Sequence, residues 1–187
     1  SSKAQIIGLA NAGGDTINAI KQAGEFGIVK GGQKLAGLLV FISDVHSLGL
    51  ERAQGLNLTE AFYWDLNDKT RDFSKRFGAR FNGKMPTSVQ AGFYSATLAY
   101  LNAVKTAGTD NPDKVMATMK AAKWDDPIFG PSYVRADGRK MHNMYLFEVK
   151  KPSESKGPWD YYKLLATIPG EEAFQPLAES GCALVKK

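Results

Sequence analysis

Two apolar segments separated by a glycine loop and a helix-like segment open the chain, and this order constrains the fold most. Residues 4–10 are a short apolar run, soon followed by two adjacent glycines. Ile17, Ile20 and Phe26 then recur at the spacing of one helix face. A second apolar run follows at residues 35–42. Strand, helix and strand in this order predict a right-handed βαβ unit with parallel strands.

Loops at the carboxyl ends of parallel strands are where α/β folds bind ligands. Here these loops are residues 11–14 and 43–47. Asp15 or Thr16 is the expected N-cap of the first helix, and Gly27 stands where a helix needs a left-handed C′ residue. The glycines of the first loop have two interpretations. They allow a tight turn between strand and helix, or they expose backbone N–H groups that contact a ligand carboxylate.

The rest of the chain predicts one more strand, three helices, a hairpin and a last strand. Three consecutive aromatic residues, Phe62, Tyr63 and Trp64, stand between the first block and the helices, and core packing is favoured over lining a cleft. The expected elements are a strand at 56–61, helices at 70–81, 88–107 and 112–122, a hairpin at 133–149 that turns at Asp137-Gly138, and a strand at 159–168.

Composition indicates an ordinary soluble domain, with 43% hydrophobic and 23% charged residues. No apolar run approaches the ~18 residues that a membrane span needs. The net charge of +5 suggests nucleic acid as a partner, but Lys and Arg are scattered between acidic residues, which argues against it. The single cysteine, Cys182, cannot form an internal disulfide.

Enzyme motifs are missing from the sequence: it has no phosphate loop, no GxSxG elbow, no HExxH and no CxxC pair. Ser43, Asp44 and His46 lie close together, but three neighbours on one loop rarely form a triad. Capping of a helix by Ser43 or Asp44 is favoured, with ligand hydrogen bonding as the alternative.

No metal or cofactor is expected. His142 is interpreted as a surface histidine on a strand, and Asp65 and Asp68 as caps of the helix near Thr70. Neither group has the number of ligands that a metal ion needs.

Six stretches together resemble the periplasmic leucine/isoleucine/valine-type solute-binding proteins of ABC transporters, especially the branch that binds aromatic acids. The stretches are IIGLANAGGDTINAIKQAGEFGI, FISDVHSLGLERAQGL, EAFYWDLND, VQAGFYSATLAYLNAVKTAGT, VRADGRKMHNMYLFEVK and PWDYYKLLATIP. Their order and spacing match along nearly the whole chain, although the chain looks like only the C-terminal half of such a protein.

The resemblance implies an α/β, periplasmic-binding-protein-like fold, the two-lobed Venus-flytrap of type I, with an incomplete second lobe and returning first-lobe helices. It divides the chain into second-lobe material at 1–62, a hinge crossover at 63–69, helices returning to the first lobe at 70–127, and a hairpin, crossover and tail at 128–187. It also implies a periplasmic protein that is not an enzyme, binds a small organic acid or amino acid and delivers it to a membrane permease.

Carried over position by position, the resemblance places second-lobe ligand contacts on two loops and weaker first-lobe contacts on the long helix. In amino-acid-binding relatives a second-lobe tyrosine and an acid hold the ligand ammonium. Here the first loop has no tyrosine and only Asp44 could be the acid, which favours an aromatic or other organic acid. The positions are Asn11, Ala12, Gly13, Phe41, Ser43, Asp44, Gln90 and Tyr94.

Two other functions stay open at this point. A sensory ligand-binding domain would share the fold and the cleft but pass closure to a receptor. An enzyme of unrecognised type would need Asp44 and His46 as an acid–base pair.

Overall fold

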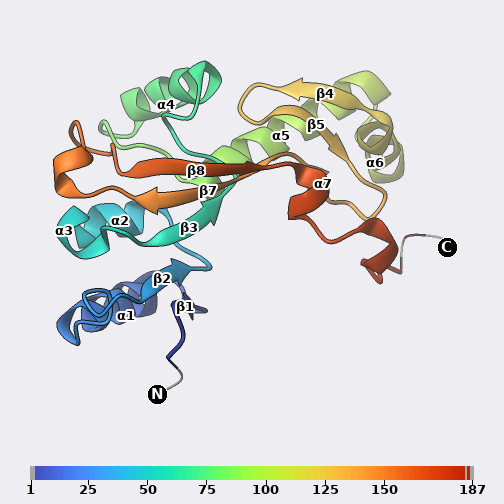
Figure 1. Ribbon diagram of the computed structural model, residues 1–187. Coiled ribbons are helices and arrows are strands. Elements are labelled where there is room, and N and C mark those ends of the chain that lie inside the picture. Colours follow the sequence, from blue (N-terminus) through green and yellow to red (C-terminus); the bar gives the residue numbers. More distant parts are fainter. Residues whose placement is uncertain (1–2, 184, 186–187) are drawn as a thin grey trace.

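A computed structural model describes residues 3–183 and residue 185. It contains a five-stranded sheet in the order β1-β2-β3-β7-β8 and a separate three-stranded sheet in the order β4-β5-β6 (Figure 1). The strands are β1 (Ile6–Leu9), β2 (Lys34–Gly37), β3 (Asn57–Glu60), β4 (Lys123–Asp126), β5 (Gly130–Val134), β6 (Lys140–Met141), β7 (Met144–Val149) and β8 (Tyr162–Ile168). The α-helices are α1 (Gly13–Glu25), α2 (Ile42–Leu48), α3 (Leu50–Ala53), α4 (Asp68–Arg80), α5 (Ser88–Ala107), α6 (Pro112–Ala121) and α7 (Gly170–Ala173).

The opening βαβ unit is confirmed. β1, β2 and β3 are parallel neighbours, and β7 and β8 extend the sheet with antiparallel pairing. Gly27 has φ +68° directly after α1, as a left-handed C′ residue should. The expected N-caps are wrong, because α1 starts after Ala12; Thr16 is buried instead and donates a hydrogen bond to Asn11 Oδ1 at 2.8 Å.

The second strand is shorter than the apolar run predicted. β2 ends at Gly37, residues 38–41 form a loop, and α2 begins at Ile42. The loop folds back so closely that a Cβ on Gly37 would lie 2.4 Å from Val40 Cγ2. The Asp44 carboxylate caps α2 by accepting a hydrogen bond from the Phe41 N–H at 2.9 Å. Residues 43–47 therefore lie on a helix, and the loop at the carboxyl end of β2 is 38–41.

The three long helices agree with the expected ranges to within two residues. The cap of α4 differs from the prediction: Asn67 Oδ1 accepts from the Thr70 N–H at 3.1 Å, while Asp65 and Asp68 pair with Arg71. On α5, Phe93 is 77% exposed, so this aromatic does not pack into the described core.

The expected hairpin is confirmed at its turn and corrected beyond it. β5 pairs with the short β6 through the turn at Asp137 and Gly138, which has φ +87°. β7 does not continue this hairpin but enters the large sheet, where Phe147 lies opposite Leu58. Long-range pairing with β3 and β8 overrides the local pattern here.

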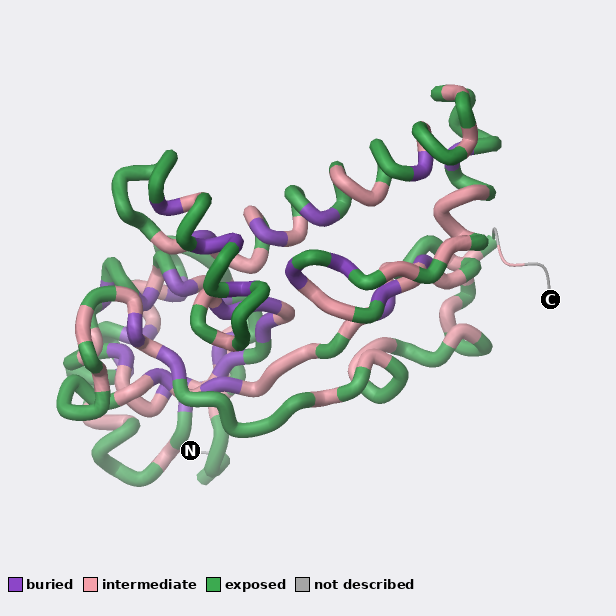
Figure 2. Tube along the Cα trace, turned by 90° about the horizontal axis from the view of Figure 1, so that it is seen from above, coloured by how far each residue is buried: buried purple, intermediate pink, exposed green. Residues whose placement is uncertain are grey.

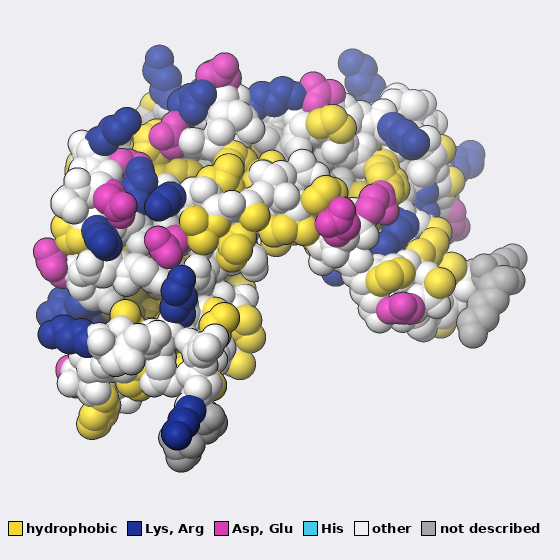
Figure 3. Space-filling model, in the orientation of Figure 1, with side chains coloured by type: hydrophobic (Ala, Val, Ile, Leu, Met, Phe, Trp, Pro, Cys, Tyr) yellow, Lys and Arg dark blue, Asp and Glu magenta, His cyan; other side chains and the backbone are white. Residues whose placement is uncertain are grey.

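Buried residues gather in two clusters, and the larger one packs α1–α3 against the five-stranded sheet. Figure 2 shows most of the buried segments in the half of the molecule that holds this sheet. The smaller cluster joins Phe62, Phe73, Ala91 and Ile128. Trp64 packs against both clusters. Phe62, Tyr63 and Trp64 thus pack internally, as favoured from the sequence. The whole molecule forms an arch, and hydrophobic side chains gather along its inner face (Figure 3).

Candidate ligand cleft

A cleft of about 390 Å³ lies at the carboxyl ends of β2 and β3. One wall is the loop 38–41, and a second is the end of β3 with Ala61. The first two turns of α5 contribute Ser88, Val89 and Gly92. Phe129, His142 and Met144 complete the lining. Most of these side chains are apolar, as in pockets that bind small organic molecules, and the cleft occupies the edge of the sheet where α/β folds bind ligands.

Glu60 is the acidic residue of this cleft, and sequence reasoning missed it. Its side chain is 5% exposed, and Oε1 accepts a hydrogen bond from Ser88 Oγ at 3.0 Å. Burial raises the pKa of Glu60 to about 8; the Ser88 bond lowers this pKa and the charge of Asp44 raises it further. The sequence does contain a sign that Glu60 is buried. Side chains two positions apart on a strand share a face, so Glu60 lies on the same face of β3 as the apolar Leu58.

His142 is half-buried in the cleft, so its interpretation as a surface histidine is corrected. Its ring lies 5.0 Å from that of Phe129, and Nδ1 is 2.8 Å from the Asn143 carbonyl oxygen. Burial lowers the pKa of His142, which keeps the imidazole neutral at pH 7.

Of the second-lobe positions expected to contact ligand, Phe41 lines the cleft. Asp44 lies behind it as the cap of α2, and Ser43 is exposed on that helix. The loop with Asn11, Ala12 and Gly13 follows β1 at the same edge of the sheet, where the Leu38 N–H donates to the Leu9 carbonyl at 3.2 Å. This loop therefore flanks the cleft without lining it.

The two positions on α5 are used elsewhere. Gln90 Oε1 accepts from the Thr87 N–H at 2.8 Å and so caps the helix. Tyr94 packs on Phe73 with ring centroids 5.1 Å apart and lines a separate pocket of about 500 Å³. The structure does not bring either residue to the cleft.

His46 and Asp44 do not form an acid–base pair. The His46 ring stacks on Trp159 at 4.0 Å, and its Nδ1 lies 2.7 Å from Tyr161 Oη. The Asp44 carboxylate is bonded to the Phe41 N–H instead. This arrangement gives no support to the enzyme alternative.

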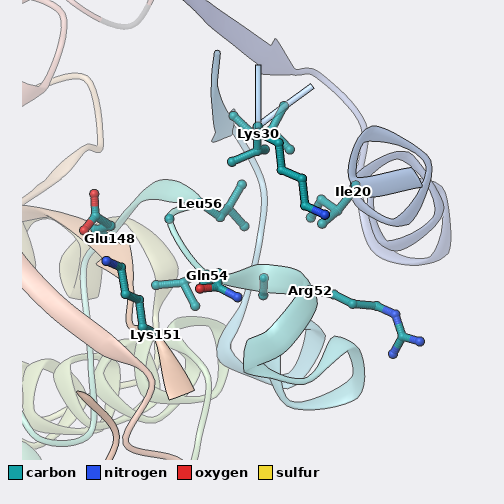
Figure 4. A pocket seen from close by; sticks show the side chains of 13 residues that line it. Ile20, Lys30, Arg52, Gln54, Leu56, Glu148 and Lys151 are labelled. Atoms are coloured by element: carbon teal, nitrogen blue, oxygen red, sulfur yellow. The ribbon is translucent and has the colours of Figure 1, made fainter. Parts of the chain in front are cut away.

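A larger pocket of about 580 Å³ lies at the opposite end of the strands, between α1, α3 and the start of β3 (Figure 4). Lys30, Arg52, Glu148 and Lys151 surround its apolar floor, and Arg52 points away from it. Because ligands of α/β folds bind at the carboxyl ends of the strands, we assign the smaller cleft as the candidate site.

Within residues 3–183 and 185, no group of His, Cys, Asp and Glu side chains is arranged to hold a metal ion. None of the helices in the same residues combines the length and the apolar character that crossing a membrane would require.

Comparisons with known proteins identify the fold. A periplasmic binding protein from Burkholderia mallei superposes with a TM-score of 0.91 at 58% identity, covering 99% of this chain and 48% of its own. A branched chain amino acid ABC transporter periplasmic ligand-binding protein from Burkholderia xenovorans gives 0.88 at 47% identity, covering 97% and 48%. A solute binding protein from Rhodopseudomonas palustris, in complex with 3,4-dihydroxy benzoic acid, gives 0.72 at 23% identity, covering 90% and 46%.

The chain thus spans about half the length of these structures, and its fold is part of a type I periplasmic binding protein. No curated protein matches it. The relatives are solute-binding proteins rather than enzymes. The family model for periplasmic binding proteins matches residues 1–158, and the chain therefore belongs to the periplasmic binding protein family.

Proposed function

We propose that the protein carrying this chain is the extracytoplasmic solute-binding component of an ABC importer. It binds a small organic acid or amino acid in the cleft and delivers it to a membrane permease. The observation that carries the proposal is the apolar cleft between the carboxyl ends of β2 and β3 and the first turns of α5. The names of the B. xenovorans and R. palustris proteins support these two ligand classes.

The proposal includes a cleft that closes by a hinge. We assign residues 1–62, which contain the parallel strands β1–β3, to the second lobe, residues 63–69 to a hinge crossover, and residues 70–127, which contain α5 and α6, to the helices that return to the first lobe. The remaining residues, 128–187, include β7 and β8, which return to the large sheet. Several crossovers between two units are what a hinge-closing binding protein needs.

Calorimetric titration of the full-length protein with α-amino acids and benzoic acids tests the proposal. We expect one-to-one binding by at least one class. Gly92→Phe should weaken this binding at least tenfold, because Gly92 lines the cleft and a phenyl ring would fill it. Ala96→Phe, one turn further along α5 at an exposed position, is the matched control and should bind normally. Unchanged binding by the Gly92→Phe variant would place the ligand elsewhere.

A further inference from the structure

His142 lines the cleft, and its ring is confined by three neighbours. The residue lies between β6 and β7 and is half-buried. Its ring centroid lies 5.0 Å from that of Phe129, and the nearly perpendicular ring of Phe174 lies 5.4 Å away. Gly170 packs so closely that a Cβ there would lie 2.6 Å from the His142 carbonyl oxygen. Packing from several sides therefore fixes the imidazole in the wall of the cleft.

The hydrogen bond of His142 decides which ring nitrogen carries the proton. Nδ1 lies 2.8 Å from the Asn143 carbonyl oxygen, which can only accept, so Nδ1 is the N–H donor. Burial lowers the pKa of His142, and the charges of Lys140 and Arg139 lower it further, so the ring is neutral at pH 7. In a neutral imidazole the second nitrogen is an acceptor. Nε2 therefore presents a lone pair and no hydrogen.

Nε2 is open to a ligand. It accepts no hydrogen bond from any residue that the structure describes. It is also not closed off from solvent: the buried side-chain atoms without a partner, among the described residues, are Ser74 Oγ and Tyr162 Oη. Because His142 lines the cleft and most of the other lining side chains are apolar, a ligand with a hydrogen-bond donor at this point gains an interaction that others lack.

Positive charge beside the imidazole disfavours a cationic donor. Lys140 Nζ lies 4.3 Å from the centroid of the Phe129 ring, and Arg139 Cζ lies 4.8 Å from that of Phe174. Asp126 compensates the charge of Lys140, but Arg139 forms no ion pair within the described part of the chain. A ligand ammonium group would be repelled here, whereas a neutral hydroxyl group can donate to Nε2. A carboxylate has no hydrogen to donate.

We infer that His142 is a specificity-determining residue of the cleft, whose Nε2 accepts a hydrogen bond from a hydroxyl group on the ring of an aromatic acid. The inference rests on the proposed function, because it takes the cleft as the ligand site and selects one of its ligand classes. Phe129 and the apolar lining suit the ring of such a ligand, and the ring hydroxyl is the neutral donor that Nε2 lacks. The ligand carboxylate then points away from this wall.

The inference predicts a preference that depends on a single hydrogen atom. Fluorine is close in size to a hydroxyl group but cannot donate a hydrogen bond. A hydroxybenzoate should therefore bind about tenfold more tightly than the benzoate that carries fluorine at the same ring position. The apolar contacts of the two ligands with the cleft are the same.

The test is calorimetric titration of the full-length protein at pH 7 with the three hydroxybenzoates, the matching fluorobenzoates and a set of α-amino acids. His142→Phe keeps a ring but removes the acceptor. His142→Gln places an amide oxygen near the position of Nε2 and should keep part of the preference. His46→Phe makes the same change at the other histidine of the sequence, which stacks on Trp159 outside the cleft, and is the matched control.

A hydroxyl preference of about tenfold supports the inference if it disappears in His142→Phe, persists in part in His142→Gln and is unchanged in His46→Phe. A merely structural role of His142 would weaken all ligands alike and leave the preference intact, which overturns the inference. Equal binding of hydroxy- and fluorobenzoates by the wild-type protein, or binding of amino acids alone, also overturns it and leaves the proposed function standing. If neither class of ligand binds, the proposed function and the inference fail together.

Discussion

Asp126 is a buried carboxylate that holds parts of three elements together. It is 1% exposed and accepts hydrogen bonds from Ser95 at 2.5 Å, Lys140 at 2.8 Å, and the backbone N–H groups of Ile128 and Phe129 at 2.9 and 3.0 Å. Asp126→Asn leaves the half-buried Lys140 without its counter-charge and weakens a buried hydrogen-bond network, which should cost about 2–4 kcal/mol of unfolding free energy. Chemical denaturation measures this loss.

Asp125→Asn is the matched control, because its ion pair with Lys69 is exposed and contributes about 0–1 kcal/mol. An equal loss in both variants would contradict the role of Asp126. Burial raises the pKa of Asp126, but its hydrogen bonds from Lys140, Ser95 and the backbone outweigh burial and lower this pKa to about 2. Since the folded pKa lies below the unfolded value of 3.8, the stabilisation is present above that value. It should be lost as the pH falls from about 4 to about 2.

The loop between β2 and α2 depends on the missing side chain of Gly37. A Cβ there would lie 2.4 Å from Val40 Cγ2. Val40 is 3% exposed in the core, so its side chain has little room to move away from an added methyl group. Gly37→Ala should cost about 1–3 kcal/mol of unfolding free energy through overpacking. Gly8→Ala on β1 meets nothing within 4 Å and should change stability by less than about 0.5 kcal/mol. Recovery of stability in the Gly37→Ala, Val40→Ala double variant would confirm the clash as the cause.

Elements set by local patterns could be predicted from the sequence, and those set by distant partners could not. The βαβ unit and α4–α6 follow from apolar spacing and turn residues that act within one segment. The run 35–42 is apolar throughout, so its composition does not reveal that the strand ends at Gly37. β7 looked like the return strand of a hairpin because its partners, β3 and β8, are distant in sequence. Glu60 was missed for a different reason. Acidic residues are mostly exposed in folded proteins, so the residue type gives no hint that this side chain is buried.

The two halves of the arch are joined most directly at Trp64, which packs against both buried clusters. Its Nε1–H donates to the Trp159 carbonyl at 2.7 Å, so the crossover at 63–69 is tied to the segment that leads into β8. Trp64→Phe keeps an aromatic ring but leaves this half-buried carbonyl with only the longer bonds from the Tyr161 N–H at 3.0 Å and from Tyr63 Oη at 3.2 Å.

Loss of the Trp64 bond should lower the unfolding free energy by about 1 kcal/mol. The effect should also be uneven across the molecule, because the joint between the two units is loosened while each unit keeps its own packing. Hydrogen exchange should therefore accelerate in α4 and α5 more than in β1–β3. Tyr100→Phe, which removes an exposed hydroxyl from α5, should leave exchange unchanged in both. Equal acceleration in α4–α5 and in β1–β3 would mean that both parts unfold in one cooperative step. In that case the crossover would connect them rigidly and would not act as a hinge.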